Sequence, residues 1–157
     1  TGDLTKVQTG IIVHQCNAQG VMGSGVAKCI REKFPDAFMA YREQYLDNRK
    51  KCKNPPLGDL SYAKVDDMLY VVNLIGQNTY YGHNGDYDKS KRHTSYDAIA
   101  DGFAKINNLY KEGALGIVPI IHIPLIGSYR GNGDWEIIKT IIERTVSKDI
   151  TINLWIK

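Results

Sequence analysis

The chain has 157 residues, of which 43% are hydrophobic and 24% are charged, with 15 glycines and 5 prolines. These proportions are typical of a globular protein and exclude disordered, collagen-like and coiled-coil chains. The net charge of +3 is too small to predict specific nucleic-acid binding. The longest apolar run, residues 115–126, is broken by two prolines and a histidine, so we expect no membrane partner. The length predicts one domain over residues 1–157.

The cysteines bear on the cellular compartment. Cys16, Cys29 and Cys52 are odd in number and lack CxxC spacing, so the sequence predicts neither a disulfide framework nor a zinc site. This usage is typical of a reducing environment, and we expect a cytoplasmic protein. No signal peptide is visible. The chain starts at Thr1 rather than Met, which leaves open a preceding short leader or strand.

The first predicted elements are a buried strand, a glycine-rich loop and two helices. Residues 10–14 form an apolar, β-branched run, which is typical of a strand covered on both faces. The glycine-rich segment 20–25 follows at once. Apolar residues then recur every four positions, which predicts a helix that ends before Pro35. A second helix is predicted from Ala37 and ends at the polar segment 47–56.

The middle of the chain predicts a hairpin, a long loop and a helix. Residues 60–65 and 68–75 read as two strands joined by a tight turn. The polar segment 76–94 predicts an exposed loop, and loops of this length are usually functional or mobile. An amphipathic helix follows, with Ser95 as its N-cap and Gly113 at its end.

The last third repeats the order of strand, glycine-rich loop and helix. A buried strand is predicted within residues 116–124 and leads into the glycine-rich segment 125–133. Asp134 is the predicted N-cap of a helix whose apolar positions extend to Val146. Residues 150–156 alternate as a final strand. Strands interleaved with helices predict an α/β sheet covered on both faces.

The two glycine-rich loops predict an anion site. In open α/β sheets, ligands bind outside the carboxyl ends of strands, where glycine loops and helix N-termini present unpaired N–H groups. A single loop would fit a tight turn as well, but two loops after two buried strands indicate a diphosphate. Neither loop is a Walker loop, because no Gly-Lys-Ser/Thr follows. The first also departs from the GxGxxG order of dinucleotide-binding folds.

Several short motifs resemble the macro domain family, in the family's order and over nearly the whole chain. They are Gly2-Asp3-Leu4, Val13-His14-Gln15-Cys16-Asn17, Gly23-Ser24-Gly25-Val26-Ala27, Ile123-Pro124-Leu125-Ile126-Gly127 and Gly133-Asp134-Trp135-Glu136. The resemblance implies a three-layer α/β/α sandwich around a central mixed sheet. It also implies ADP-ribose as the ligand, bound without a metal or other cofactor.

The resemblance assigns binding roles residue by residue. Asp3 would accept a hydrogen bond from the adenine amino group, Leu4 would add a neighbouring backbone contact, and Asn17 would orient the distal ribose. The phosphate-loop positions are Gly23, Ser24, Gly25 and Val26 in the first loop and Gly127, Ser128, Tyr129, Arg130 and Gly131 in the second. Tyr129 and Arg130 replace residues that are commonly Gly and Leu in the family. The aromatic ring could cover the ribose, and the guanidinium could contact a phosphate or be merely solvated.

His14 carries the catalytic hypothesis. Followed by x-Cys-Asn, it resembles the branch containing ADP-ribose-1″-phosphate phosphatases, in which this histidine is implicated in catalysis. An ordinary histidine pKa of about 6.5 permits general acid, general base and nucleophilic roles. A buried histidine satisfied by a backbone carbonyl is the structural alternative. The resemblance therefore implies a hydrolase of ADP-ribose-1″-phosphate, with His14 and Asn17 as catalytic residues.

Two other functions stay open: removal of ADP-ribose from modified proteins or nucleic acids, and recognition of ADP-ribose without catalysis. ADP-ribosylated macromolecules are accordingly a further class of partner. One hydrolase branch uses a lysine after the fourth-strand region and an acidic residue in the second loop. Gln77 and Asn78 lie in the first region and Gly131 or Asn132 in the second, which disfavours that chemistry. Gln77, Asn78 and Tyr80 are expected to line the distal ribose pocket instead.

Overall fold

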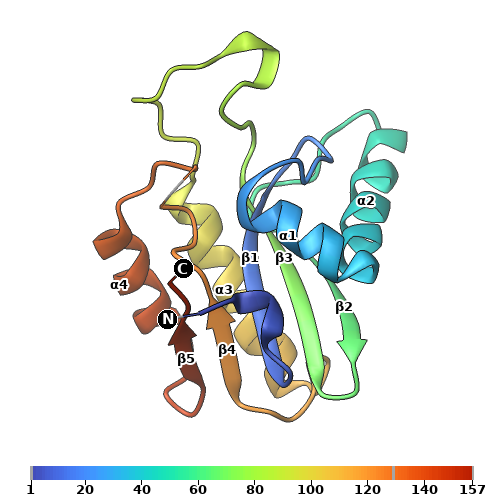
Figure 1. Ribbon diagram of the computed structural model, residues 1–157, viewed down its shortest axis with the longest axis vertical. Helices are drawn as coiled ribbons and strands as arrows, with labels where there is room; N and C mark the ends of the chain where they lie inside the picture. Colours follow the sequence, from blue (N-terminus) through green and yellow to red (C-terminus); the bar gives the residue numbers. More distant parts are fainter. Residues whose placement is uncertain (1, 129, 157) are drawn as a thin grey trace.

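The computed structural model describes residues 2–128 and 130–156, which form a five-stranded sheet between two layers of helices (Figure 1). The strands are β1 (Gly10–Asn17), β2 (Leu60–Asp66), β3 (Leu69–Gln77), β4 (Ile120–Ile123) and β5 (Thr151–Leu154). Their order in the sheet is β2-β3-β1-β4-β5. The β2–β3 pair is antiparallel, and the β1–β3, β1–β4 and β4–β5 pairs are parallel. The predicted mixed sheet is confirmed.

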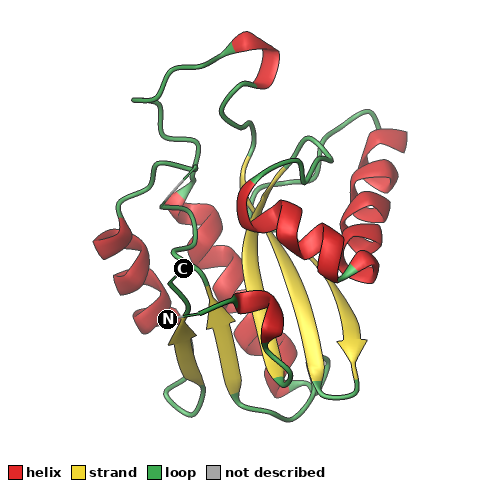
Figure 2. Ribbon diagram, in the orientation of Figure 1, coloured by secondary structure: helices red, strands yellow, loops and turns green. Residues whose placement is uncertain are grey.

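Helices cover both faces of the sheet. They are α1 (Gly25–Lys33), α2 (Pro35–Lys50), α3 (Tyr96–Lys111) and α4 (Trp135–Thr145), with short 3-10 turns η1 (Leu4–Lys6) and η2 (His83–Gly85). Figure 2 shows η1, α1 and α2 on the near side of the sheet and α3 and α4 on the far side. This is the predicted three-layer α/β/α sandwich. Among the described residues, no helix has the length and apolar character needed to cross a bilayer.

The central strand β1 is buried on both faces. Ile11 and Val13 pack with residues of α3 and α4, whereas Ile12 packs with residues of η1, α1 and α2. All three side chains are 0% exposed. Successive side chains of a strand point to opposite faces, so a continuous apolar run requires helices on both sides. The first half of β1 pairs with both β3 and β4, and its carboxyl end pairs with β3.

Helices α1 and α2 follow one another without a loop. Phe34 is both the C-cap of α1 and the N-cap of α2, and Pro35 is the first residue of α2. The sequence predicted the start of α2 at Ala37. Proline favours the first helical position because its φ is fixed near the helical value and its missing N–H would have no helical partner there. The helix also continues to Lys50, into the polar segment. Its last turn is largely exposed, so polar side chains there can remain helical and in contact with water.

The strand ends differ most from the prediction. β1 continues to Asn17 and β3 to Gln77, beyond the apolar runs that marked them, whereas β5 stops at Leu154. Polar side chains occupy the extended ends and find hydrogen-bond partners there. Apolar alternation cannot reveal such residues. These polar strand ends form the floor of the site.

Candidate active site

A cavity of about 420 Å³ opens at the carboxyl ends of β1, β3, β4 and β5. Its walls come from the end of β1, the start of α1, Gln77 and Tyr80, residues 124–127 after β4, and residues 155–156 after β5. Figure 1 shows these segments meeting at the upper edge of the sheet. The cavity has the size of an ordinary small-molecule site.

The cavity brings most of the predicted site residues together. The predicted residues in its lining are His14, Asn17, Ser24, Gly25, Val26, Gly127, Arg130 and Gly131, with Gln77 and Tyr80 beside them. The described residues Asp3, Leu4, Gly23, Ser128 and Asn78 lie outside this lining. Tyr129 lies outside the described residues. Asp3 caps η1, and its Oδ1 accepts hydrogen bonds from the Thr5 backbone N–H (2.9 Å) and the Thr5 hydroxyl (2.7 Å).

Tyr41 of α2 holds the first glycine-rich loop. Its side chain is 0% exposed, and burial raises the pKa of its phenol, so the hydroxyl stays protonated. The hydroxyl accepts from the Gly20 N–H (3.1 Å) and lies 2.7 Å from the carbonyl oxygen and 2.9 Å from the Oδ1 of Asn17. Asn17 in turn accepts from the Gln19 N–H (2.9 Å) and donates to the Val21 carbonyl (3.0 Å). Asn17 therefore shapes this loop from within.

The N-terminus of α1 lines the cavity, and the N–H groups of its first turn have no partner within the helix itself. Ser24 is its N-cap, and the Ser24 side chain makes no capping hydrogen bond. Gly25 has a φ of +62°, and the first turn, all of it described, holds no acidic side chain. Arg130 lies across from it, because a Cβ placed on Gly25 would be 3.3 Å from the Arg130 Nε. A helix N-terminus and a guanidinium on one cavity wall favour an anionic ligand.

Thr94 and Gln15 hold the second glycine-rich loop. The Thr94 hydroxyl donates to the Gly127 carbonyl (2.7 Å) and accepts from the Gln15 Nε2 (2.9 Å). The backbone N–H of Thr94 donates to the Gly131 carbonyl (3.1 Å). A side chain on Gly131 would collide with the Thr94 hydroxyl, so glycine is required there. Gln15 also bonds Gln77 (2.6 Å) and links the ends of β1 and β3 to this loop.

Replacing Thr94 with valine tests this tether. Valine has nearly the shape of threonine, but it cannot make the hydrogen bonds to Gln15 and Gly127. The buried Gly127 carbonyl therefore loses the Thr94 hydroxyl as a donor. We expect the free energy of unfolding to fall by about 1–3 kcal/mol and nucleotide affinity to fall with it. Urea unfolding and calorimetric titration measure the two effects. Thr140→Val, which removes an exposed hydroxyl bonded within α4, is the matched control. Equal effects from both variants would contradict the tether.

His14 is deeply buried at the cavity floor. Its side chain is 1% exposed, and its Nε2 lies 2.6 Å from the Oδ1 of Asn73. The Cys16 Sγ lies 3.8 Å from Nε2 and 3.9 Å from Nδ1. Burial lowers the pKa of His14 to about 4, against a smaller opposing effect of the Asn73 hydrogen bond. The ring is therefore neutral at neutral pH, which suits a base or nucleophile and disfavours a proton donor.

Trp155 gives the cavity an aromatic wall that the sequence did not predict. The sequence placed residues 155–156 in the last strand, but β5 ends before them and both line the cavity. The Trp155 indole donates to the Nδ1 of His122 (2.9 Å), and the His122 Nε2 donates to the Thr9 carbonyl (2.9 Å). With the neighbouring Pro124 and Leu125, this wall suits a flat apolar ring.

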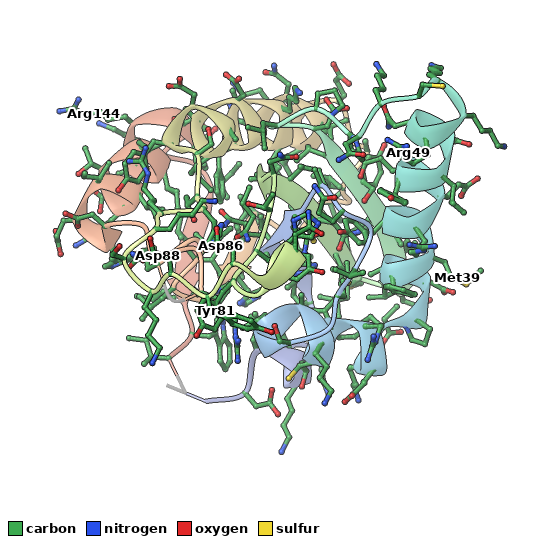
Figure 3. All side chains as sticks on the ribbon, turned by 90° about the horizontal axis from the view of Figure 1, so that it is seen from above. Met39, Arg49, Tyr81, Asp86, Asp88 and Arg144 are labelled. Carbon is green, nitrogen blue, oxygen red and sulfur yellow. The ribbon has the colours of Figure 1, made fainter. Side chains whose placement is uncertain are left out.

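The loop over residues 78–94 lies above the carboxyl edge of the sheet. Figure 3, viewed from above, shows Tyr81, Asp86 and Asp88 in this loop. Two of its basic residues have local partners: Lys91 pairs with Asp86 (2.9 Å), and the Arg92 guanidinium lies 4.2 Å from the Tyr96 ring centre. The loop therefore offers little unmatched positive charge at these positions. Within residues 2–128 and 130–156, no cluster of three His, Cys, Asp or Glu side chains could hold a metal ion.

Two curated enzymes are similar to parts of the chain. An ADP-ribose 1″-phosphate phosphatase of Neosartorya fischeri is 45% identical over 42 residues, which are 26% of this chain and 21% of that enzyme. A DNA ADP-ribosyl glycohydrolase of Mycobacterium tuberculosis is 26% identical over 136 residues, 87% of this chain and 34% of that enzyme. The chain thus spans about a fifth and a third of these relatives.

Solved structures share the fold over almost the whole chain. A protein of unknown function from Bacteroides thetaiotaomicron has a TM-score of 0.75 and 26% identity, covering 96% of this chain and 90% of its own. Thermosipho africanus DarTG, solved in complex with ADP-ribose, has a TM-score of 0.73 and 18% identity, covering 99% of this chain and 40% of its own. At that identity, the second likeness concerns the fold alone.

Family membership rests on two long matches. An uncharacterized 17.5 kDa protein of Enterobacteria phage T4 is 31% identical over 150 residues, 92% of this chain and 85% of the phage protein. The family model named Macro domain matches residues 13–142. These residues run from β1 into α4 and include the ends of β1 and β3, the two glycine-rich loops and the start of α1. The chain belongs to the macro domain family.

Proposed function

We propose that the protein binds ADP-ribose in this cavity and hydrolyses ADP-ribose-1″-phosphate to ADP-ribose and phosphate. The observation that carries the proposal is the meeting of three groups at one cavity. These are the uncapped N-terminus of α1 at Ser24, the guanidinium of Arg130, and the neutral imidazole of His14. The first two attract phosphates, and the third can act on phosphorus.

The cavity lining suggests an order for the parts of the nucleotide. The diphosphate would lie between the α1 N-terminus and the second loop, where backbone N–H groups and Arg130 neutralise its charge. The adenine ring would stack against Trp155 at the apolar end. The distal ribose would then lie beside Asn17, Gln77 and Tyr80, near His14. That order would bring the 1″-phosphate to the floor of the cavity, near His14.

The neutral His14 determines the chemistry that we propose. Its imidazole would attack phosphorus, with the P–O1″ bond breaking, or would remove a proton from the attacking water. In the first case the phosphoryl group passes to His14, O1″ takes a proton from water, and a second water hydrolyses the phosphohistidine to phosphate and free imidazole. In the second case water adds to phosphorus, and the proton that His14 accepts is returned to the departing O1″. Both routes yield ADP-ribose and phosphate. Asn17 would position the distal ribose, and the loop amides would stabilise the charge that develops on the phosphate oxygens. The 42-residue similarity to a phosphatase supports this reaction.

Removal of ADP-ribose from modified DNA or protein is the second candidate. The relative named a DNA ADP-ribosyl glycohydrolase matches 87% of the chain and favours it. Against it, the described lining of the cavity contains neither lysine nor carboxylate, and Arg130 is its cation. Glycosidic hydrolysis generally relies on carboxylates as acid and base. The phosphatase reaction therefore fits the described lining better.

Paired binding and turnover measurements test the proposal. Calorimetry would measure ADP-ribose binding, and phosphate release would measure turnover of ADP-ribose-1″-phosphate. We expect His14→Gln, whose amide can still bond Asn73, to retain binding and lose at least about 100-fold in turnover. His83→Gln, in the loop above the cavity, is the matched control. Binding without any turnover would identify a recognition module, and release of ADP-ribose from modified DNA or protein would support the second candidate. Unchanged turnover in His14→Gln would remove His14 from the mechanism.

A further inference from the structure

We propose that Asn73 is a positioning residue for His14, which fixes the imidazole as its Nε2–H tautomer and leaves the lone pair on Nδ1. The inference rests on the proposed function, because it concerns which nitrogen of His14 would act on the phosphate.

Sheet register places the two residues opposite each other. His14 of β1 and Asn73 of β3 are partners in the parallel pairing, and Asn73 and Ser61 of β2 are partners in the antiparallel one. The three side chains form a row across three strands beneath α2 and are 1%, 0% and 9% exposed, respectively. The next positions on the same face are apolar, namely Ile12 and Cys16 of β1 and Val71 and Ile75 of β3. A polar row in such a core costs stability unless each member is hydrogen-bonded.

The hydrogen bonds of Asn73 define its orientation. Its Nδ2 donates to the Ala37 carbonyl (2.9 Å) and lies 3.0 Å from the Ser61 hydroxyl. A carbonyl can only accept, so the amide nitrogen faces Ala37 and the amide oxygen faces His14. That oxygen lies 2.6 Å from the His14 Nε2 and has no proton to donate. Nε2 must therefore carry the proton, and Nδ1 of the neutral ring carries the lone pair.

The groups around the ring keep it uncharged. The Cys16 thiol lies 3.9 Å from Nδ1, and burial raises its pKa, so it stays protonated. Tyr41, the titratable group of α2 that interacts with Cys16, is likewise neutral. Asn73 and Ser61 contribute dipoles from β3 and β2 without charge. A carboxylate in place of Asn73 would orient the ring equally well but would favour its protonated form. The amide orients His14 and leaves its lone pair available.

Nitrogen NMR of the full chain tests the tautomer directly. With ¹⁵N-labelled histidine and His14→Gln for assignment, we expect His14 to show a protonated Nε2 and an unprotonated Nδ1 at pH 7. Saturating ADP-ribose-1″-phosphate should shift the Nδ1 resonance more than the Nε2 resonance. A protonated Nδ1 in the free protein, or an Nδ1 resonance that the ligand leaves unchanged, would overturn the inference.

Asn73→Asp tests the positioning role through the pH profile of kcat. We expect the acid limb of the profile to move upward by about one to three pH units, in step with the His14 pKa measured by NMR. A merely structural role of Asn73 would change stability without moving this limb. Ser61→Ala, which removes the far member of the row, should leave the limb in place. If Asn73→Asp folds and its His14 pKa rises, but the acid limb of the kcat profile does not move, the inference is overturned.

Asn73→Ser keeps the inference testable if the aspartate variant does not fold. The shorter side chain withdraws the acceptor from Nε2, and we expect kcat to fall about tenfold or more while KM changes little. An unchanged kcat would contradict the positioning role. A wild-type protein that releases no phosphate would refute only the phosphatase proposal. The NMR measurement would then decide the tautomer and the contact with Nδ1 without reference to turnover.

Discussion

Tyr41→Phe is expected to lower the free energy of unfolding by about 2–3 kcal/mol and to weaken ADP-ribose binding at least tenfold. The hydroxyl is buried, accepts from the Gly20 N–H and contacts two oxygens of Asn17. Without it, the Gly20 N–H and the Asn17 carbonyl lose a partner that water cannot readily replace. The first glycine-rich loop would then loosen at the cavity wall.

Denaturant unfolding and calorimetric titration of the same preparation measure both effects of Tyr41→Phe. Tyr62→Phe is the matched control, because Tyr62 is 40% exposed on β2 and lies outside the cavity lining. We expect that control to change stability by less than about 0.5 kcal/mol and to leave affinity unchanged. If Tyr41→Phe binds ADP-ribose as tightly as the wild type, the loop does not depend on this hydroxyl.

Acidification is expected to destabilise the protein by about 3 kcal/mol between pH 7 and pH 4 through His14 alone. Its pKa is about 4 in the folded protein against an ordinary value of 6.5, because burial disfavours the charged ring. The unfolded chain therefore binds more protons in this range, and stability rises with pH from about 4 to about 6.5. Burial also lowers the pKa values of His93 and His122, which adds to the same trend.

Urea unfolding at a series of pH values measures this dependence. We expect His14→Gln to be less steep than the wild type between pH 4 and pH 6.5, whatever its stability at pH 7. His83→Gln should retain the wild-type slope, because His83 lies in η2 above the sheet, away from the buried row. Parallel curves for the wild type and His14→Gln would mean that the His14 ring is not held neutral by burial.

Apolar periodicity predicted the layers of the fold correctly. The run at the start of β1 requires cover on both faces, and the spacing of α3 requires one buried side, so both elements follow from local sequence. The glycine-rich loops likewise indicated the edge of the sheet at which the cavity lies. The prediction that α1 ends before Pro35 is confirmed, whereas the predicted start of α2 at Ala37 is two residues late, because Pro35 itself begins that helix.

The contacts that shape the site lay beyond the reach of sequence patterns. Gln15 and Thr94 are 79 residues apart, and nothing in the local spacing of either indicates their hydrogen bond. The pairing of His14 with Asn73 depends on the register of β1 against β3, which is a property of the folded sheet. Trp155 completed an alternating pattern and was therefore assigned to the strand, although it lies just past the end of β5.

The tethering of both glycine-rich loops to the core has a consequence for selectivity. Tyr41 fixes one loop and Thr94 the other through hydrogen bonds made within the protein itself. Association then needs little chain ordering, so a correctly shaped ligand loses less conformational entropy. If the two loops hold the diphosphate as we propose, a ligand with one phosphate or with three would not match the separation that these tethers set. Rejection of such nucleotides would arise from rigidity itself, without a dedicated repulsive residue.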